Sequence, residues 1–178
     1  MTDLRIRPEA PADYPVIERL LIETFRASYG TGPEEAEIVA QLRGIVPCIA
    51  LVAEAEGAIL GYNFISPAAL AEYPAVPVAV LGPIGVRADC QRQGVGSRLM
   101  REGLAAARQA GYHAIVLTGD AHYYRRFGFI PISETRLQTI FHTPHDQVLE
   151  LQPGTLARVS GLVTYPEPWL KFVPEEGA

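Results

Sequence analysis

The sequence predicts an α/β (α+β) chain in which helices flank a central mixed, mostly antiparallel sheet, and two observations carry that prediction. Residues 49–53 and 59–65 are apolar runs separated by a short polar turn, which is typical of an antiparallel hairpin. Further on, an apolar strand beginning near Val78, a helical pattern over 96–110 and a second apolar strand over 114–118 follow in order. A strand–helix–strand unit implies a parallel crossover, so we expect one parallel pair inside the sheet.

Length and composition place the chain among ordinary globular domains. With 178 residues it suits a single domain over 1–178, and 48% hydrophobic with 20% charged residues argues against a disordered or fibrous class. A net charge of -5 argues against a general nucleic-acid binder. Charges, prolines or glycines interrupt every apolar run, and the N-terminus lacks a signal-peptide core, so we expect a cytoplasmic protein that does not enter a membrane. Cys48 and Cys90 form no CxxC pair and lie near no plausible zinc-ligand histidines, so no metal is expected.

The N-terminal third predicts one strand and two helices. Residues 4–7 alternate apolar and polar side chains before Pro8, which indicates a short strand. Apolar residues then recur at helical spacing over 14–25, and the Asp13 side chain is expected to cap this helix. A second helix is expected to begin at Pro33, because glutamates fill its first turn.

The central strand contains an unusual proline. Residues 66–77 predict a loop, and the strand that follows from Val78 holds Pro83 between Gly82 and Gly85. Because proline cannot donate to a strand ladder, we expect a bulge here. Not all of the backbone groups over 84–86 are then used by neighbouring strands, and those left over can bind a ligand.

The remaining elements are marked by glycines and short apolar runs. The helix over 96–110 should end at Gly111, and a polar-aromatic segment over 122–127 should form a short helix that stops at Gly128. In the C-terminal third we expect an alternating strand at 148–151, a turn at 153–154 and a last strand over 157–165, followed by a loose tail at 174–178.

The stretch from Gln91 to Ser97 is the strongest functional signal. It is a glycine-rich turn that opens directly into a helix, where unpaired amides and the macrodipole favour an anion. No GxxxxGK[ST] pattern occurs, which excludes a P-loop, and Leu99 stands where a dinucleotide fingerprint needs its third glycine. The pattern that remains is Gln/Arg-x-x-Gly-x-Gly/Ala.

This pattern resembles the coenzyme A pyrophosphate loop of the GNAT superfamily of N-acetyltransferases. A second segment, Tyr-Tyr-Arg-Arg-Phe-Gly-Phe at 123–129, is similar to the aromatic-Tyr-x-x-x-Gly-Phe segment of that superfamily and falls after the expected next strand. The order of expected elements also agrees, so the resemblance spans nearly the whole chain. The pieces at 81–84, 123–129 and 154–161 are most similar to a bacterial subgroup, the YhbS-like predicted N-acetyltransferases.

The resemblance implies a GNAT fold with a splayed parallel pair of central strands, acetyl-CoA as co-substrate and no metal. It implies that amides over 93–97 hold the pyrophosphate, that the strand at 84–86 pairs with the pantetheine arm, and that Tyr124 donates to the departing sulfur. The cofactor-binding residues it implies are Ile84, Gly85, Val86, Gln91, Arg92, Gln93, Gly94, Val95, Gly96, Ser97, Tyr124 and Phe127. Tyr124 is the implied catalytic residue.

The expected activity is transfer of an acetyl group from the thioester to a primary amine of a small molecule or protein. Two alternatives stay open: a non-catalytic acyl-CoA-binding sensor or interaction module with the same fold, and a nucleotide-binding regulator. The expected partner is a small-molecule or peptide amine, and the protein is expected to be a monomer or homodimer. No general base is assigned, because every candidate also fits a solvated surface group; the candidates are Glu54, Glu56, Glu72, Asp120, His122, His142 and His145.

Overall fold

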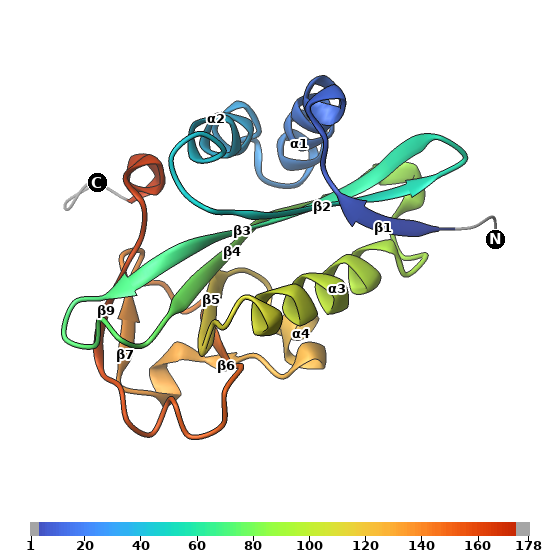
Figure 1. The fold of residues 1–178 in the computed structure, drawn as a ribbon. Coiled ribbons are helices and arrows are strands. Elements are labelled where there is room, and N and C mark those ends of the chain that lie inside the picture. The colour runs from blue at the N-terminus through green and yellow to red at the C-terminus, as the bar shows by residue number, and fades with distance from the viewer. Residues whose placement is uncertain (1–3, 174–178) are drawn as a thin grey trace. The chain divides into compact units, whose positions relative to one another are not determined.

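The structure is a computed structural model that describes residues 4–173, so the tail expected to be loose at 174–178 lies outside the described residues. Figure 1 shows its strands, which are β1 (Arg5–Pro8), β2 (Ile49–Ala55), β3 (Ala58–Leu70), β4 (Val78–Val86), β5 (Ala114–Thr118), β6 (Ile130–Pro131), β7 (Leu137–Thr139), β8 (Asp146–Glu150) and β9 (Gly161–Thr164). The α-helices are α1 (Tyr14–Tyr29), α2 (Pro33–Leu42), α3 (Val95–Gln109) and α4 (Ala121–Tyr124). Short 3-10 helices lie at η1 (Pro11–Asp13), η2 (Ala88–Cys90), η3 (Arg125–Phe127), η4 (Ile132–Glu134) and η5 (Glu167–Phe172).

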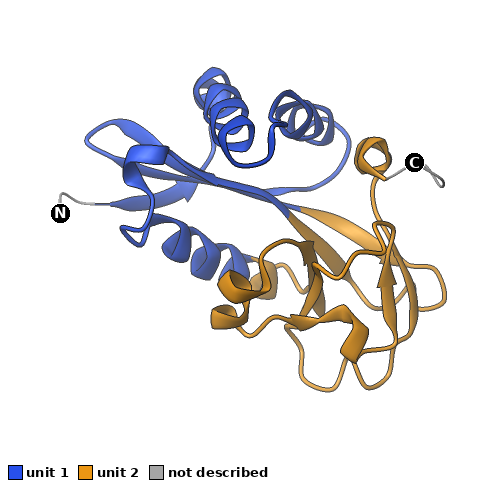
Figure 2. Ribbon diagram, turned by 180° about the vertical axis from the view of Figure 1, so that it is seen from behind, with its two compact units in different colours: residues 1–65, 82–106 blue, residues 66–81, 107–178 orange. Residues whose placement is uncertain are grey.

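The chain divides into two compact units, which Figure 2 colours blue and orange. The first unit comprises Met1–Ile65 and Gly82–Ala106, and the second comprises Ser66–Leu81 and Ala107–Ala178. Strands β3 and β4 and helix α3 each contribute residues to both units.

In the first unit, β1, β2 and β3 pair in antiparallel fashion, with Arg5 opposite Glu54 and Ile49 opposite Ile65. The β2–β3 turn consists of Glu56 and Gly57, whose φ angles of 51° and 76° are both positive. A two-residue turn with two positive φ angles matches the right-handed twist of its strands. The predicted hairpin is therefore confirmed, with a turn shorter than the polar stretch that marks it.

Helices α1 and α2 begin where the sequence predicts them, but α1 continues four residues beyond the predicted range to Tyr29, and its cap differs. Asp13 makes no side-chain cap bond to α1. Its carboxylate instead accepts from both terminal nitrogens of Arg7, at 2.6 and 3.0 Å, and from the Ala10 amide at 2.7 Å. The expectation that Asp13 caps α1 is therefore wrong, because a guanidinium and the amide before η1 already occupy both of its oxygens.

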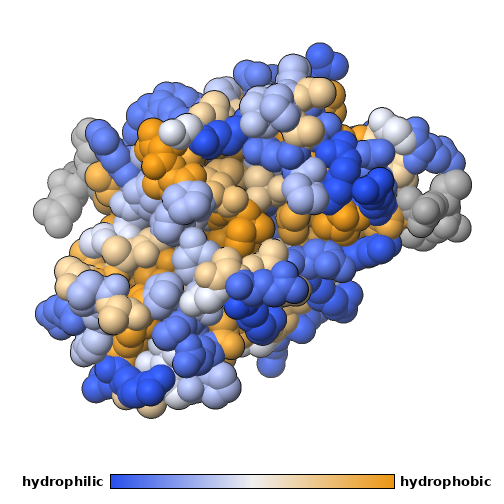
Figure 3. All heavy atoms as spheres, viewed as in Figure 1, coloured by the Kyte–Doolittle hydropathy of each residue, from blue (hydrophilic) through white to orange (hydrophobic). Residues whose placement is uncertain are grey.

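Helix α3 packs closely on β3 in the first unit because glycines remove side chains at the contact. A Cβ on Gly103 would lie 2.3 Å from Asn63 Nδ2, and one on Gly61 would lie 2.9 Å from Leu99 Cδ1. Asn63 is buried and donates to the Leu99 carbonyl at 3.1 Å. Leu99 and Met100 are fully buried, whereas the arginines of α3 lie on its hydrophilic outer side, part of which Figure 3 shows.

The second unit contains the parallel pair that the sequence predicts. Strands β4 and β5 pair in parallel over Val78–Val80, with Val80 opposite Val116. Both strands continue, but Leu81 and Leu117 are not paired, so the two strands part at this point. Strand β8 then pairs antiparallel with β5 and with β6. This mixed, mostly antiparallel sheet with flanking helices confirms the predicted fold class.

Three details of the second unit differ from the sequence prediction. Strand β3 runs through the expected loop to Leu70, because Ala69 and Leu70 pair with β9. Strand β9 is shorter than the predicted range and forms a second parallel pair, with β7. The side chains of β8 are buried on both faces of the strand. The alternation of apolar and polar residues in its sequence therefore does not correspond to one buried and one exposed face. Buried side chains from β4, β5, β8 and β9 share one apolar cluster in this unit.

Candidate anion site and aromatic segment

The glycine-rich turn begins where β4 ends. The Arg87 amide, one residue after β4, donates to the Leu60 carbonyl of β3 at 2.9 Å. Helix η2 follows, residues 91–94 form an exposed turn, and α3 starts at Val95. The strand, turn and helix that the sequence predicts therefore follow one another within the first unit.

Side chains of the turn itself fix its backbone. Gln91 Nε2 donates to the Val86 carbonyl at 3.0 Å, and Gln93 Nε2 donates to the Asp89 carbonyl at 2.8 Å. Gly94 has a φ of 90°, and Arg92 has a φ of 58°, which is uncommon for a residue with a side chain. The two glutamine side chains therefore hydrogen-bond to the backbone just before the turn instead of pointing into solvent.

The first amides of α3 are available to a ligand. The first helical hydrogen bond runs from the Arg98 amide to the Gly94 carbonyl, at 3.0 Å. Among residues 4–173, none accepts a hydrogen bond from the amides of Val95, Gly96 or Ser97. Three unpaired amides at the positive end of a fifteen-residue helix attract an anion.

The two arginines near the turn, Arg87 and Arg92, differ in whether they already have an acidic partner. Arg87 forms an ion pair with Asp89, with Nη2 2.6 Å from Oδ2, and both side chains are exposed. The Arg87 guanidinium lowers the pKa of Asp89 below its ordinary value. Arg92 is exposed, and no side chain in the described part of the chain pairs with it. Arg92 is therefore better placed than Arg87 to meet a phosphate.

The strand segment 84–86 divides its side chains between two partners within the first unit. Ile84 and Val86 pack beside the cluster that holds Val95 and Leu99 of α3. Gly85 faces α1 instead, because a Cβ there would lie 3.3 Å from Leu20 Cδ2. The structure thus brings together the predicted cofactor-binding residues of the first unit, namely Ile84, Gly85, Val86, Gln91, Arg92, Gln93, Gly94, Val95, Gly96 and Ser97.

The remaining predicted site residues, Tyr124 and Phe127, lie in the second unit. Helix α4 is capped by Asp120, whose Oδ1 accepts from the His122 amide at 2.8 Å, and the segment ends at Gly128 with a φ of 92°. The Tyr124 ring makes T-shaped contacts with the rings of Tyr123 and Phe129, with centroids 5.0 and 5.8 Å apart. Tyr123 also contacts Phe127 at 5.5 Å. Tyr123 and Tyr124 thus lie in the middle of a row of four aromatic rings that runs from Phe127 to Phe129.

Two of the candidate general bases already have structural roles. Glu54 accepts from Arg7 Nε at 2.6 Å, in the same cluster as Asp13, and Asp120 caps α4. For the other candidates the structure adds no argument in favour of base chemistry.

Sequence reasoning missed a buried carboxylate, Asp146, that accepts from the hydroxyls of Thr118, Thr139 and Thr143. Thr139 and Thr143 precede Asp146 by seven and three residues, but Thr118 lies 28 residues before it, and only the fold brings all three hydroxyls to one carboxylate.

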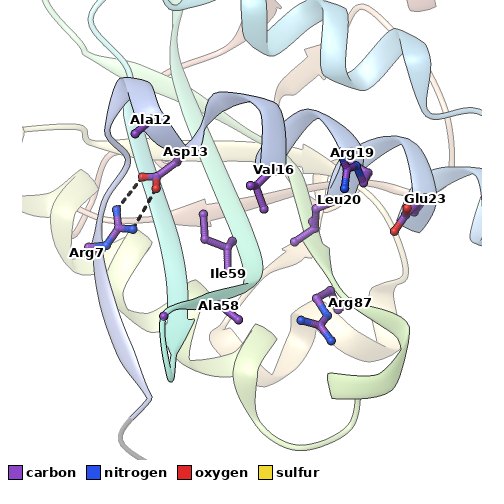
Figure 4. A pocket seen from close by; sticks show the side chains of 11 residues that line it. Arg7, Ala12, Asp13, Val16, Arg19, Leu20, Glu23, Ala58, Ile59 and Arg87 are labelled. Atoms are coloured by element: carbon purple, nitrogen blue, oxygen red, sulfur yellow. Dashed lines mark hydrogen bonds and ion pairs between the residues drawn. The ribbon is translucent and has the colours of Figure 1, made fainter.

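A cavity of about 410 Å³ lies on the α1 side of the first unit. Figure 4 shows its lining, with Arg7 and Asp13 at one end and Arg87 at the other, over a floor that includes Leu20 and Ile59. Asp13 and Glu54 neutralise Arg7, and Asp89 neutralises Arg87. The cavity contains none of the predicted cofactor-binding residues.

The described residues contain no group of three or more histidine, cysteine or acidic side chains that could hold a metal ion. Across the same residues, no helix is both long and apolar enough to cross a membrane.

Comparison with known proteins agrees with this arrangement of strand, glycine turn and helix. The acetyltransferase (GNAT) family matches residues 14–129. The chain belongs to this family and is a GNAT-type N-acetyltransferase.

Its similarity to individual relatives extends over nearly the full length. The uncharacterized N-acetyltransferase YhbS of Escherichia coli (strain K12) is 32% identical over 171 residues, which cover 94% of this chain and 99% of YhbS. A crystal structure of E. coli YhbS in complex with CoA has a TM-score of 0.87 at 32% identity, covering 97% of this chain and 94% of that one. A GNAT family acetyltransferase from Brucella melitensis, in complex with acetyl-CoA, has a TM-score of 0.79 at 33% identity and covers 95% of this chain and 99% of its own.

Proposed function

We propose that this protein transfers an acetyl group directly from the thioester of acetyl-CoA to a primary amine of a small molecule or protein. The observation that carries the proposal is the row of unpaired amides at Val95, Gly96 and Ser97, directly after a glycine turn, in a member of the GNAT family. Relatives from E. coli and B. melitensis that hold CoA and acetyl-CoA support the choice of co-substrate. A cytoplasmic location and one domain over residues 1–178 stay part of the proposal.

The proposal assigns the cofactor to groups of the first unit. The amides from Gln93 to Ser97 bind the pyrophosphate, and the exposed Arg92 guanidinium adds a positive charge beside it. Strand residues 84–86 pair with the amide groups of the pantetheine arm. The assignment to backbone donors agrees with the side chains of Gln91 and Gln93, which are bonded to the preceding Val86 and Asp89 carbonyls.

The chemistry is attack of a neutral amine on the thioester carbonyl carbon. The carbonyl oxygen gains negative charge, which we assign the Val86 amide to stabilise, and the C–N bond forms as the C–S bond breaks. The amine proton passes to water, since no side chain is assigned as base. Tyr124 donates a hydrogen bond to the departing sulfur. Because a phenol has a pKa of about 10 and a thiol one of about 8.5, Tyr124 stabilises the thiolate without giving up its proton fully.

The test combines binding and turnover. Acetyl-CoA should raise Tm and release heat in calorimetry, and free thiol should appear when polyamines, amino acids, aminoglycosides or peptide N-termini are added. Tyr124→Phe should lower kcat at least tenfold and leave acetyl-CoA binding nearly unchanged, whereas Tyr123→Phe, which removes a hydroxyl from the neighbouring ring, should retain turnover. Binding without turnover of any amine would favour the acyl-CoA sensor, and preference for ATP or NAD would favour the nucleotide-binding regulator.

A further inference from the structure

We propose that Gln147 is a positioning residue for Tyr124, acting through the peptide of Gly119, and that Asp146 supports it. This inference rests on the proposed function, because it concerns the residue assigned to the leaving thiolate. All the groups involved lie in the second unit.

Both the amide and the carbonyl of Gly119 form hydrogen bonds. Their partners lie at the start of β8 and in the residue before it. The Gly119 amide donates to the His145 carbonyl at 3.0 Å. The Gly119 carbonyl accepts from Gln147 Nε2 at 2.9 Å, and Gln147 is 1% exposed. Gly119 follows β5 directly, so these two bonds fix the point at which the chain turns from the strand toward α4.

The Tyr124 ring rests on Gly119. A Cβ on Gly119 would lie 2.5 Å from Tyr124 Cε2 and 3.4 Å from Cζ, so the ring occupies the space that a side chain would need. The rings of Tyr123 and Phe129 contact the same ring in T-shaped arrangements. The ring can keep this position only while the Gly119 peptide keeps its own, and Gln147 holds that peptide.

Asp146 anchors the residue before Gly119. It is 2% exposed, and its Oδ1 accepts from Thr118 Oγ1 at 2.7 Å and Thr143 Oγ1 at 3.0 Å. Its other oxygen accepts from the Thr139 hydroxyl and the Thr143 amide. A buried carboxylate with a full set of donors fixes the elements that supply them. Asp146 and Gln147, adjacent in β8, thus hold Thr118 and Gly119, which are also adjacent.

Geometry of this kind matters for catalysis because a donor to a leaving group must be placed to within a fraction of an ångström. The position of the Tyr124 ring requires both the glycine at 119 and the glutamine at 147. The first leaves room for the ring, and the second supplies the bond that stops the peptide from rotating away.

The test replaces Gln147 with leucine, which has similar size but cannot donate. In the full-length protein, Gln147→Leu should lower kcat about tenfold with little change in the KM for acetyl-CoA. In a Tyr124→Phe background the same substitution should have almost no further effect on kcat. Both substitutions remove the same interaction, the hydrogen bond from Tyr124 to the departing sulfur. Gln138→Leu, at an exposed position of β7, is the matched control and should leave kcat unchanged.

A second measurement reports the ring itself and needs no turnover. In protein labelled with ring-¹³C tyrosine, Tyr124→Phe identifies the Tyr124 signal among the eight tyrosines. Gln147→Leu should shift that signal, since the ring leaves its place between Tyr123 and Phe129, and Gln138→Leu should not. Gln147→Glu is the second variant, because its protonated carboxyl group can donate to the Gly119 carbonyl and should return the signal toward that of the wild type at low pH.

Additive losses of kcat in the double variant, or an unmoved Tyr124 signal in a folded Gln147→Leu protein, would overturn the positioning role. If the wild type binds acetyl-CoA but turns over no amine, the proposed function fails, and the ring signal still decides the positioning role.

Discussion

Substituting Gly94 with alanine should weaken the binding of acetyl-CoA. The loss of affinity should be larger than the accompanying loss of folding stability explains. Gly94 has a φ of 90°, and a Cβ there would meet no atom within 4 Å. The substitution therefore adds backbone strain without a steric clash. Holding a residue with a side chain in the left-handed region costs roughly 1–2 kcal/mol, which for a chain of this length lowers Tm by about 2–8 °C.

The chain offers a matched control at the other end of the same helix. Gly111 follows α3 with a φ of 86°, and a Cβ there would also meet nothing within 4 Å. Gly111→Ala should therefore lower Tm by a similar amount. Only Gly94→Ala should affect the ligand, because relaxation of the strained turn reorients the amides of Val95, Gly96 and Ser97. Loss of one hydrogen bond to a charged phosphate costs about 1.5–3 kcal/mol, or about 10- to 150-fold in Kd.

The assay is thermal unfolding of both variants, followed by calorimetric titration with acetyl-CoA below their Tm. Equal Kd values for Gly94→Ala and the wild type would refute the assignment of the α3 amides to the pyrophosphate. So would an equal loss of affinity in Gly111→Ala, since that outcome ties binding to general stability.

Three further predictions concern stability and reactivity. Asp13→Asn should cost about 1–3 kcal/mol of unfolding free energy at pH 7, by removing the carboxylate that Arg7 bonds. Since Arg7 lowers the pKa of Asp13, the contribution of the pair is complete above the ordinary pKa of about 3.9 and is lost as the pH falls below it, so the cost should shrink toward pH 3 in urea unfolding. Burial raises the pKa of Cys48 to about 11, so its alkylation by iodoacetamide near pH 8 should be roughly 100-fold slower than that of an ordinary thiol, as mass spectrometry would measure. Gly103→Ala should destabilise the protein by about 1–3 kcal/mol despite the better helix propensity of alanine, because its Cβ would lie 2.3 Å from Asn63 Nδ2.

Each of these predictions has a contradicting outcome. A cost for Asp13→Asn that is constant from pH 7 to pH 3 would show that the ion pair does not titrate as described. Alkylation of Cys48 as fast as that of a model peptide would mean that the thiol is not shielded, and Cys48→Ser identifies its peptide. If Gly103→Ala is as stable as the wild type, the contact is loose. The double variant with Asn63→Ala should recover part of the loss, because it removes the group that the new methyl meets.

The features that the sequence predicts well are those that neighbouring residues determine. The Glu56–Gly57 turn, the glycine turn before α3 and the stop at Gly128 depend on the conformations that their own residues allow. The apolar run over 114–118 is likewise sufficient to define β5 with its observed bounds. The resemblance to the GNAT superfamily rests on two such local segments, which is why the order of the residues is enough to reveal it.

What the sequence does not predict depends on contacts between distant residues. Asp13 looks like a helix cap, but Arg7 of β1 takes its carboxylate, and Glu54 joins them from β2 only because β1 and β2 pair. Pro67 lies in the predicted loop and suggests the end of a strand. Strand β3 nevertheless continues to Leu70, because this residue pairs with β9 from a distant part of the chain. The donors to Asp146 are similarly brought together by β5, β7 and the segment before β8.

The two glutamines of the glycine turn have a consequence for how fast and how tightly a ligand binds. Because Gln91 and Gln93 already hold the Val86 and Asp89 carbonyls, the turn has a defined conformation in the free protein. Ordering a free side chain on binding costs about 0.5–1.5 kcal/mol, and here that entropy is lost during folding instead. The turn is thus preorganised, and association should proceed in a single kinetic phase without a slow rearrangement of the loop. Free and bound forms of the turn should superimpose to within about 1 Å.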